Sequence, residues 1–146
     1  MAHPIHPALA HFPVACWSLC TIGDIASLAL ADQRVWFTSG VLLVIGLAAA
    51  VAAMVAGLFE LGKIAGDSAA MQVANWHMYL VVAAWSLYAL SLSMRLNGST
   101  FIRPNGVAIG LSVLGFSILC AAGWLGGTLV YGHGVGVNAR HNPESH

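Results

Sequence analysis

Four long apolar segments, separated by short polar stretches, make up most of this chain. They run roughly over residues 7–31, 36–59, 78–96 and 107–131. Each reaches the length of about 18 or more largely apolar residues that an α-helix needs to cross about 30 Å of hydrocarbon. The pattern predicts an all-α integral membrane protein, in which residues 1–146 form a single up-and-down four-helix bundle.

Composition supports a membrane location in contact with the lipid bilayer. Hydrophobic residues make up 59% of the 146 residues and charged residues only 7%, which is less charge than a soluble domain of this size carries. The formal net charge is zero and no basic stripe is present, so nucleic-acid binding is not expected. The first ten residues contain no Lys or Arg, and we therefore expect the first segment to be a retained span rather than a signal peptide.

Small residues on two segments predict how the helices pack. They recur at a spacing of four on the second segment (Ala48, Ala52 and Ala56) and as two pairs on the fourth (Gly106/Gly110 and Gly123/Gly127). In lipid, helices associate through close backbone approach at small residues. We expect these ridges to lie in the helix interfaces; the alternative is a homodimer face on the fourth segment, in a homo-oligomer or a larger membrane complex.

Histidines gather at one end of the predicted bundle. Four crossings return the chain to its starting face, which places the following residues together: His3, His6, His11, Glu60, His77 and His133. An ionisable group within or at the edge of an apolar span is costly unless it is paired or functional, and His11 and Glu60 occupy such positions. The sequence therefore predicts a ligand-rich site at one membrane boundary.

Charged residues at the other end suggest a structural pair and an orientation. Asp24 is deep in the first segment, and we expect it to form an ion pair with Arg95 or Arg103 rather than a proton relay. Three Arg residues flank that end, against Lys63 and Arg140 at the histidine end. Because positive charge favours the cytoplasmic side, the histidine end and both termini are expected to be periplasmic.

The N-terminal run HPIHPALAHFP has a physical logic of its own. Each proline removes a backbone donor and fixes φ, which predicts a stiff, non-helical lead-in that carries His3 and His6. Pro7 suits the first turn of a helix. Rigid presentation of imidazoles favours metal or haem ligation, and helix capping is the alternative interpretation.

Several motifs together resemble a known family. They are the opening HPIHPALAHFPVA, Asp24, the GLFE stretch that ends at Glu60, His77, and the closing GWLGGTLVYGHGVGV. The chain resembles a bacterial membrane family catalogued as a domain of unknown function, family 2231, whose members usually have Asp in place of Glu60. Relatives are joined to Rieske iron–sulfur and c-type cytochrome domains, which implies a redox setting at the outer face of the bacterial inner membrane.

The leading functional hypothesis is a small b-type cytochrome. Two histidines on diagonal helices of a bundle can bind a haem iron from both sides, and His11 and His77 fit best by depth. His133 and Glu60 then support the cofactor. The protein would be an electron carrier or a haem-bearing subunit of a respiratory complex, with quinol, a Rieske protein or a cytochrome c type protein as partner.

Two other hypotheses stay open. In the first, the histidines bind a non-haem Fe, Cu or Zn ion, and the ligands are His3, His6, His11, His77 and His133. In the second, the protein is a structural accessory subunit whose histidine end docks a partner. No residue has the pattern of a nucleophile or general base with a dedicated partner, so no catalytic residue and no substrate chemistry is predicted.

Overall fold

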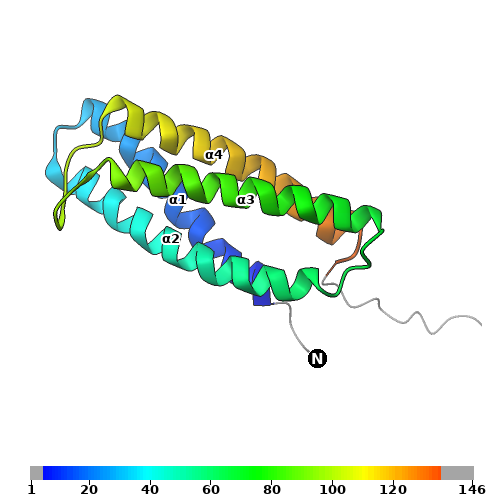
Figure 1. Cartoon of the computed structure of the whole chain (residues 1–146). Helices are drawn as coiled ribbons and strands as arrows, with labels where there is room; N and C mark the ends of the chain where they lie inside the picture. The colour runs from blue at the N-terminus through cyan, green and yellow to red at the C-terminus, as the bar shows by residue number, and fades with distance from the viewer. Residues whose placement is uncertain (1–4, 136–146) are drawn as a thin grey trace, which may run out of the picture.

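Four helices lie side by side and alternate in direction (Figure 1). The structure is a computed structural model, and it describes residues 5–135. Its helices are α1 (Ile5–Ala29), α2 (Gln33–Leu61), α3 (Ala69–Ser93) and α4 (Gly106–Gly127), which continues as a π-helical turn, η1 (Thr128–Gly132). The prediction of an all-α up-and-down bundle is confirmed, and the predicted spans match the observed helices closely at most of their ends.

Side-chain caps fix where three of the helices begin. Asp32, Ser68 and Asn105 each accept a hydrogen bond from a backbone N–H two or three residues later, at the starts of α2, α3 and α4. Such caps satisfy donors that have no partner within the helix. The cap at Ser68 explains why α3 begins well before the apolar run at residues 78–96, in a stretch that hydropathy assigns to a connection.

The connection between α3 and α4 is a small β-hairpin. Strands β1 (Leu96–Asn97) and β2 (Thr100–Phe101) pair antiparallel, and Gly98 adopts a φ of 62° in the turn. A positive φ is easily reached by glycine because it has no Cβ. The Phe101 side chain then packs on α2, where a Cβ at Gly40 would lie 2.6 Å from the ring.

The helices have the length and surface of a membrane bundle. Three are long and apolar enough to cross a membrane: His6–Ala29, Gln33–Leu61, and α4 with its extension to Gly132. The helix α3 has the same length as α1, 25 residues, but carries more Trp, Tyr and Ser. Many large apolar side chains on all four helices face outward, a surface that a soluble monomer would not expose and that lipid solvates.

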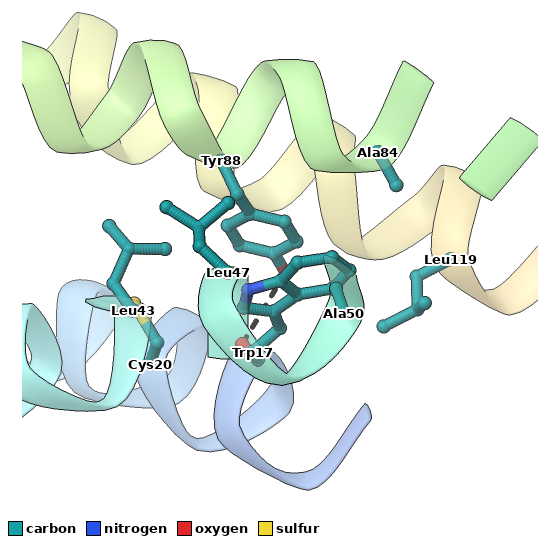
Figure 2. Packing of buried hydrophobic residues seen from close by; sticks show 8 residues of the cluster. All are labelled: Trp17, Cys20, Leu43, Leu47, Ala50, Ala84, Tyr88 and Leu119. Carbon is teal, nitrogen blue, oxygen red and sulfur yellow. Dashed lines mark hydrogen bonds between the residues drawn. The ribbon is translucent and has the colours of Figure 1, made fainter. Parts of the chain in front are cut away.

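Aromatic rings from α1 and α3 fill the middle of the bundle (Figure 2). The Trp17 and Tyr88 rings stack with centroids 4.7 Å apart and an interplanar angle of 19°. Each ring lies against a glycine of a neighbouring helix, Gly46 on α2 for Trp17 and Gly115 on α4 for Tyr88. A Cβ at these glycines would approach the rings to 2.6 Å and 3.1 Å, so the missing side chains make room for the aromatic core.

The prediction that the small-residue ridges lie in the helix interfaces is wrong. Ala48 and Ala52 are exposed, and nothing lies within 4 Å of a Cβ built at the predicted glycines Gly106, Gly110, Gly123 and Gly127. The small residues inside the bundle are instead Gly46, Ala50, Ala53, Gly115 and Ala122. A spacing of four identifies a stripe, but the large rings of α1 and α3 select the face, since only that face must accommodate them.

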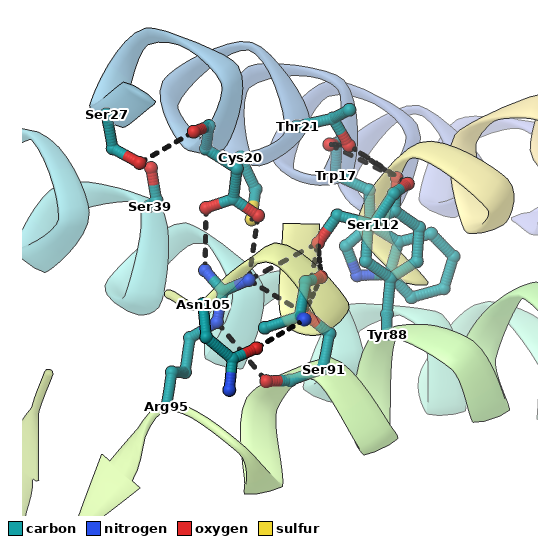
Figure 3. A network of polar contacts seen from close by, with 12 residues as sticks. Trp17, Cys20, Thr21, Ser27, Ser39, Tyr88, Ser91, Arg95, Asn105 and Ser112 are labelled. Atoms are coloured by element: carbon teal, nitrogen blue, oxygen red, sulfur yellow. Dashed lines mark hydrogen bonds and ion pairs between the residues drawn. The ribbon is translucent and has the colours of Figure 1, made fainter. Parts of the chain in front are cut away.

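A buried ion pair between α1 and the residue after Met94 belongs to a network of polar contacts (Figure 3). Both Asp24 carboxylate oxygens accept hydrogen bonds from the Arg95 guanidinium at 2.7 Å, and both side chains are fully buried. The hydroxyl groups of Ser91 and Ser112 accept further hydrogen bonds from Arg95. The predicted pairing of Asp24 is confirmed with Arg95, whereas Arg103 donates to the Ser27 carbonyl near the end of α1.

Candidate two-histidine site

His6 lies in the first turn of α1 and turns into the bundle. Its Nδ1 is 2.7 Å from the carbonyl oxygen of Ala53 on α2, and its ring lies against Gly57, where a Cβ would approach the ring to 3.0 Å. Its backbone N–H, which has no acceptor within the helix, donates to Glu60 Oε1 at 3.3 Å. Thus the Ala53 carbonyl and the Glu60 carboxylate of α2 hold His6 in place, and Gly57 leaves room for its ring.

The expected non-helical lead-in does not include His6, because α1 already begins at Ile5. Pro7 is in the first helical turn, where its missing N–H leaves no hydrogen bond unmade. Pro13 lies inside the helix and is buried, still near enough to the start to be tolerated. The opening prolines therefore begin a helix rather than delay it, and His6 gains a fixed direction from the helical backbone.

His77 on α3 repeats the carbonyl and glycine contacts of His6, but without a carboxylate contact among the described residues. Its Nδ1 is 2.8 Å from the carbonyl oxygen of Ala122 on α4, and its half-buried ring lies against Gly126, where a Cβ would approach it to 3.3 Å. A carbonyl oxygen can only accept a hydrogen bond. The Nδ1 atoms of both His6 and His77 must therefore carry the proton, which leaves Nε2 of each neutral ring as the atom with a free lone pair.

The two rings meet across the interior of the bundle. Their centroids are 6.3 Å apart and their planes are almost perpendicular, at 88°. They come from α1 and α3, which are diagonal because each helix packs mainly on α2 or α4. Ring orientation fixed by a backbone carbonyl at Nδ1 is the arrangement that metal-binding histidines use. The pair thus offers two oriented imidazoles to one ligand.

The structure distributes the other predicted site residues differently. His11 is exposed, and its Nδ1 donates to the Pro7 carbonyl of its own helix at 2.6 Å, so the structure does not bring it to His77. His133 is also exposed, directly after η1. Glu60 is half-buried and accepts a hydrogen bond from the backbone of His6, and His3 lies outside the described residues. The site that the structure assembles is His6, His77 and Glu60.

The number of ligands limits the chemistry of this site. Within residues 5–135, no group of three or more His, Cys, Asp or Glu side chains is arranged to hold a metal ion. Structural and catalytic zinc sites use three or four protein ligands. The imidazoles that the described residues bring together are those of His6 and His77.

Comparison with known proteins identifies the family. A family model described as "Predicted membrane protein (DUF2231)" matches residues 2–139. The chain belongs to the DUF2231 family. The resemblance read from the terminal motifs thus extends over nearly the whole sequence. No curated protein and no solved structure matches the chain. Membership of the DUF2231 family supports a multi-pass membrane protein, and its function has to be argued from the site.

Proposed function

We propose that this protein is a small membrane electron-transfer protein that binds haem b through His6 and His77. The observation that carries the proposal is the pair of imidazoles on diagonal helices, each with its Nδ1–H bound to a backbone carbonyl. A haem iron with two axial histidines needs no further protein ligand. The donor set therefore matches haem better than it matches a zinc ion.

The separation of the rings supports the same assignment. The two ring centroids are 6.3 Å apart, so both imidazoles could reach one bound group. Because Gly57 and Gly126 already contact the rings, binding of a macrocycle requires the histidine end of the bundle to open beside them.

The residues of the chain tune such a centre through hydrogen bonds and charge. Donation from Nδ1–H to Ala53 and Ala122 carbonyl oxygens increases the basicity of the Nε2 atoms and fixes the ring directions. Glu60 adds a carboxylate next to His6. A haem iron supplies one-electron oxidation and reduction when it is bound.

The close packing around the rings favours a second candidate function, the binding of a single metal ion. A bare ion is much smaller than a macrocycle, so it would require less opening of the helices beside Gly57 and Gly126. Imidazole binds copper, zinc, iron and nickel, and two ligands on opposite sides of a metal suit a cuprous ion. This candidate shares His6 and His77 with the first and differs only in the cofactor.

The visible spectrum of the purified protein tests the proposal. We expect a reduced-minus-oxidised difference spectrum with a sharp α-band, and about one haem per chain by extraction. A colourless protein that retains copper or another metal in elemental analysis supports the second candidate. A protein with neither haem nor metal contradicts both, and favours a structural accessory role.

We further propose that the histidine end faces the periplasm of a bacterial inner membrane. The excess of Arg near the opposite end supports this orientation, since positive charge favours the cytoplasmic side. Quinol or an outer-face Rieske or c-type cytochrome protein could then exchange electrons with the site. We expect a C-terminal alkaline phosphatase fusion to be active and a C-terminal fluorescent protein fusion, which folds in the cytoplasm, to be dark. The reverse pattern contradicts this orientation.

A further inference from the structure

Residues that meet across α1 and α3 are related by a constant interval in the sequence. The same 71 residues separate His6 from His77, Trp17 from Tyr88, and Asp24 from Arg95. Each of these three pairs is in direct contact, as neighbouring rings, stacked rings or an ion pair. Equivalent positions of the two helices therefore face one another at three levels along the bundle.

The helices α2 and α4 show a similar relationship. Every buried residue of α4 corresponds to a buried residue of α2 at one constant interval: Ser39 to Ala108, Gly40 to Ile109, Leu43 to Ser112, Gly46 to Gly115, Ala50 to Leu119, and Ala53 to Ala122. This second interval is slightly shorter than the first, and the difference falls between Asp24 and Ser39 in the first half and between Arg95 and Ala108 in the second. In the other direction the correspondence has one exception, because the counterpart of the buried Leu47 is the exposed Phe116.

Contacts between the helices are repeated as well. His6 donates to Ala53 and lies on Gly57, while His77 donates to Ala122 and lies on Gly126. Ala53 and Ala122 are separated by the same interval as Gly57 and Gly126. This is also the interval that relates the buried residues of α2 and α4. Helical periodicity alone makes buried faces look alike, but it does not reproduce a hydrogen bond and a glycine contact for each ring.

The contacts of the Trp17 and Tyr88 rings follow the same two intervals. Trp17 lies on Gly46 and Tyr88 lies on Gly115, so the rings follow the first interval and their glycines follow the second. Because α1 and α3 run in the same direction (Figure 1), the operation that relates the two hairpins is a rotation about an axis parallel to the bundle. Parallel internal repeats with an axis along the membrane normal occur in other membrane proteins.

We infer that the chain consists of two copies of one helical hairpin, residues 5–61 and 69–132, and that the His6–His77 pair is a two-fold site on the axis between them. Each copy contributes one imidazole from its first helix and one carbonyl and one glycine from its second. Such a site would suit a ligand that offers two equivalent positions to the two imidazoles. The nature of this ligand rests on the proposed function, whereas the repeat does not.

Valine substitutions at the two glycines that lie against the histidine rings test the symmetry. Gly57→Val and Gly126→Val should each push one ring off its carbonyl, and the two variants should lose cofactor affinity to the same extent, about 10- to 100-fold, as for the loss of an orienting group. Gly123→Val is the matched control, because a Cβ there has open space on the same helix as Gly126. If only one of the variants Gly57→Val and Gly126→Val loses cofactor affinity, the two-fold site is contradicted.

A second measurement does not need the cofactor. Nitrogen-15 NMR of histidine-labelled full-length protein in detergent should show His6 and His77 as Nδ1–H tautomers, assigned with the single alanine variants. Gly57→Val should remove this signature from His6 alone and Gly126→Val from His77 alone. If the protein binds neither haem nor metal but both signatures behave in this way, the proposed function fails and the repeat stands. If only one ring has the Nδ1–H tautomer, the repeat is contradicted.

Discussion

His6→Ala and His77→Ala should each abolish cofactor retention, and to the same degree. In the proposed centre each variant removes one of the two imidazoles, and residues 5–135 bring no group of three metal-ligating side chains together that could replace it. The measurement is cofactor content per folded protein, by absorbance and metal analysis after gel filtration. Addition of free imidazole to the purified alanine variants should restore part of the binding, because it fills the vacated space.

His11→Ala and His133→Ala are the matched controls for this prediction. Both side chains are exposed at the same end of the molecule, and neither turns into the bundle. Their variants should retain the wild-type cofactor content. If His11→Ala loses the cofactor while His6→Ala keeps it, His11 and His77 bind the cofactor, and the assignment of His6 is wrong.

Asp24→Ala or Arg95→Ala should destabilise the bundle by about 3–5 kcal/mol, since each change leaves an unpaired charge where the side chains are fully buried. Such a loss can exceed half the stability of a small protein. We expect little folded protein from either variant, measured as the monodisperse fraction in gel filtration and as the midpoint of thermal unfolding in detergent.

An uncharged double variant separates the loss of attraction from the burial of a lone charge. Asp24→Leu combined with Arg95→Met removes both charges, and apolar replacements of a buried ion pair are often neutral or stabilising. We expect the double variant to be more stable than either single alanine variant. If it is equally unstable, the surrounding hydrogen bonds to Ser91 and Ser112, rather than the lone charge, determine the stability.

Hydropathy predicted the bundle because lipid imposes both the length and the composition of its helices. The four helices and the partner of Asp24, as one of two candidates, followed from the sequence. The start of α3 did not, because a Ser68 cap and half-polar turns form a helix without being apolar. Hydropathy detects the part of a helix that lies in lipid, and it does not detect polar turns that extend outside the lipid.

The candidate site was predicted only in its general position. Depth in the apolar run favoured His11 over His6, but depth does not determine on which side of a helix a residue lies. A helix turns by about 100° per residue, so His6 faces inward and His11 outward. The signal that could have identified His6 is its spacing to Trp17, which equals the spacing of His77 to Tyr88. Without a contact to align them, these two spacings carry no evident meaning.

The buried ion pair can form only late in synthesis, because Asp24 is on α1 and Arg95 follows α3. The ribosome releases the α1–α2 hairpin first, and Asp24 then lies in a span without its partner, a costly state in lipid. Arg95 arrives only at the end of α3, 71 residues later. Because one hairpin carries the acid and the other the base, two copies of the first hairpin cannot reproduce the Asp24–Arg95 ion pair. The acid of each first half is therefore paired only when a second half supplies the arginine.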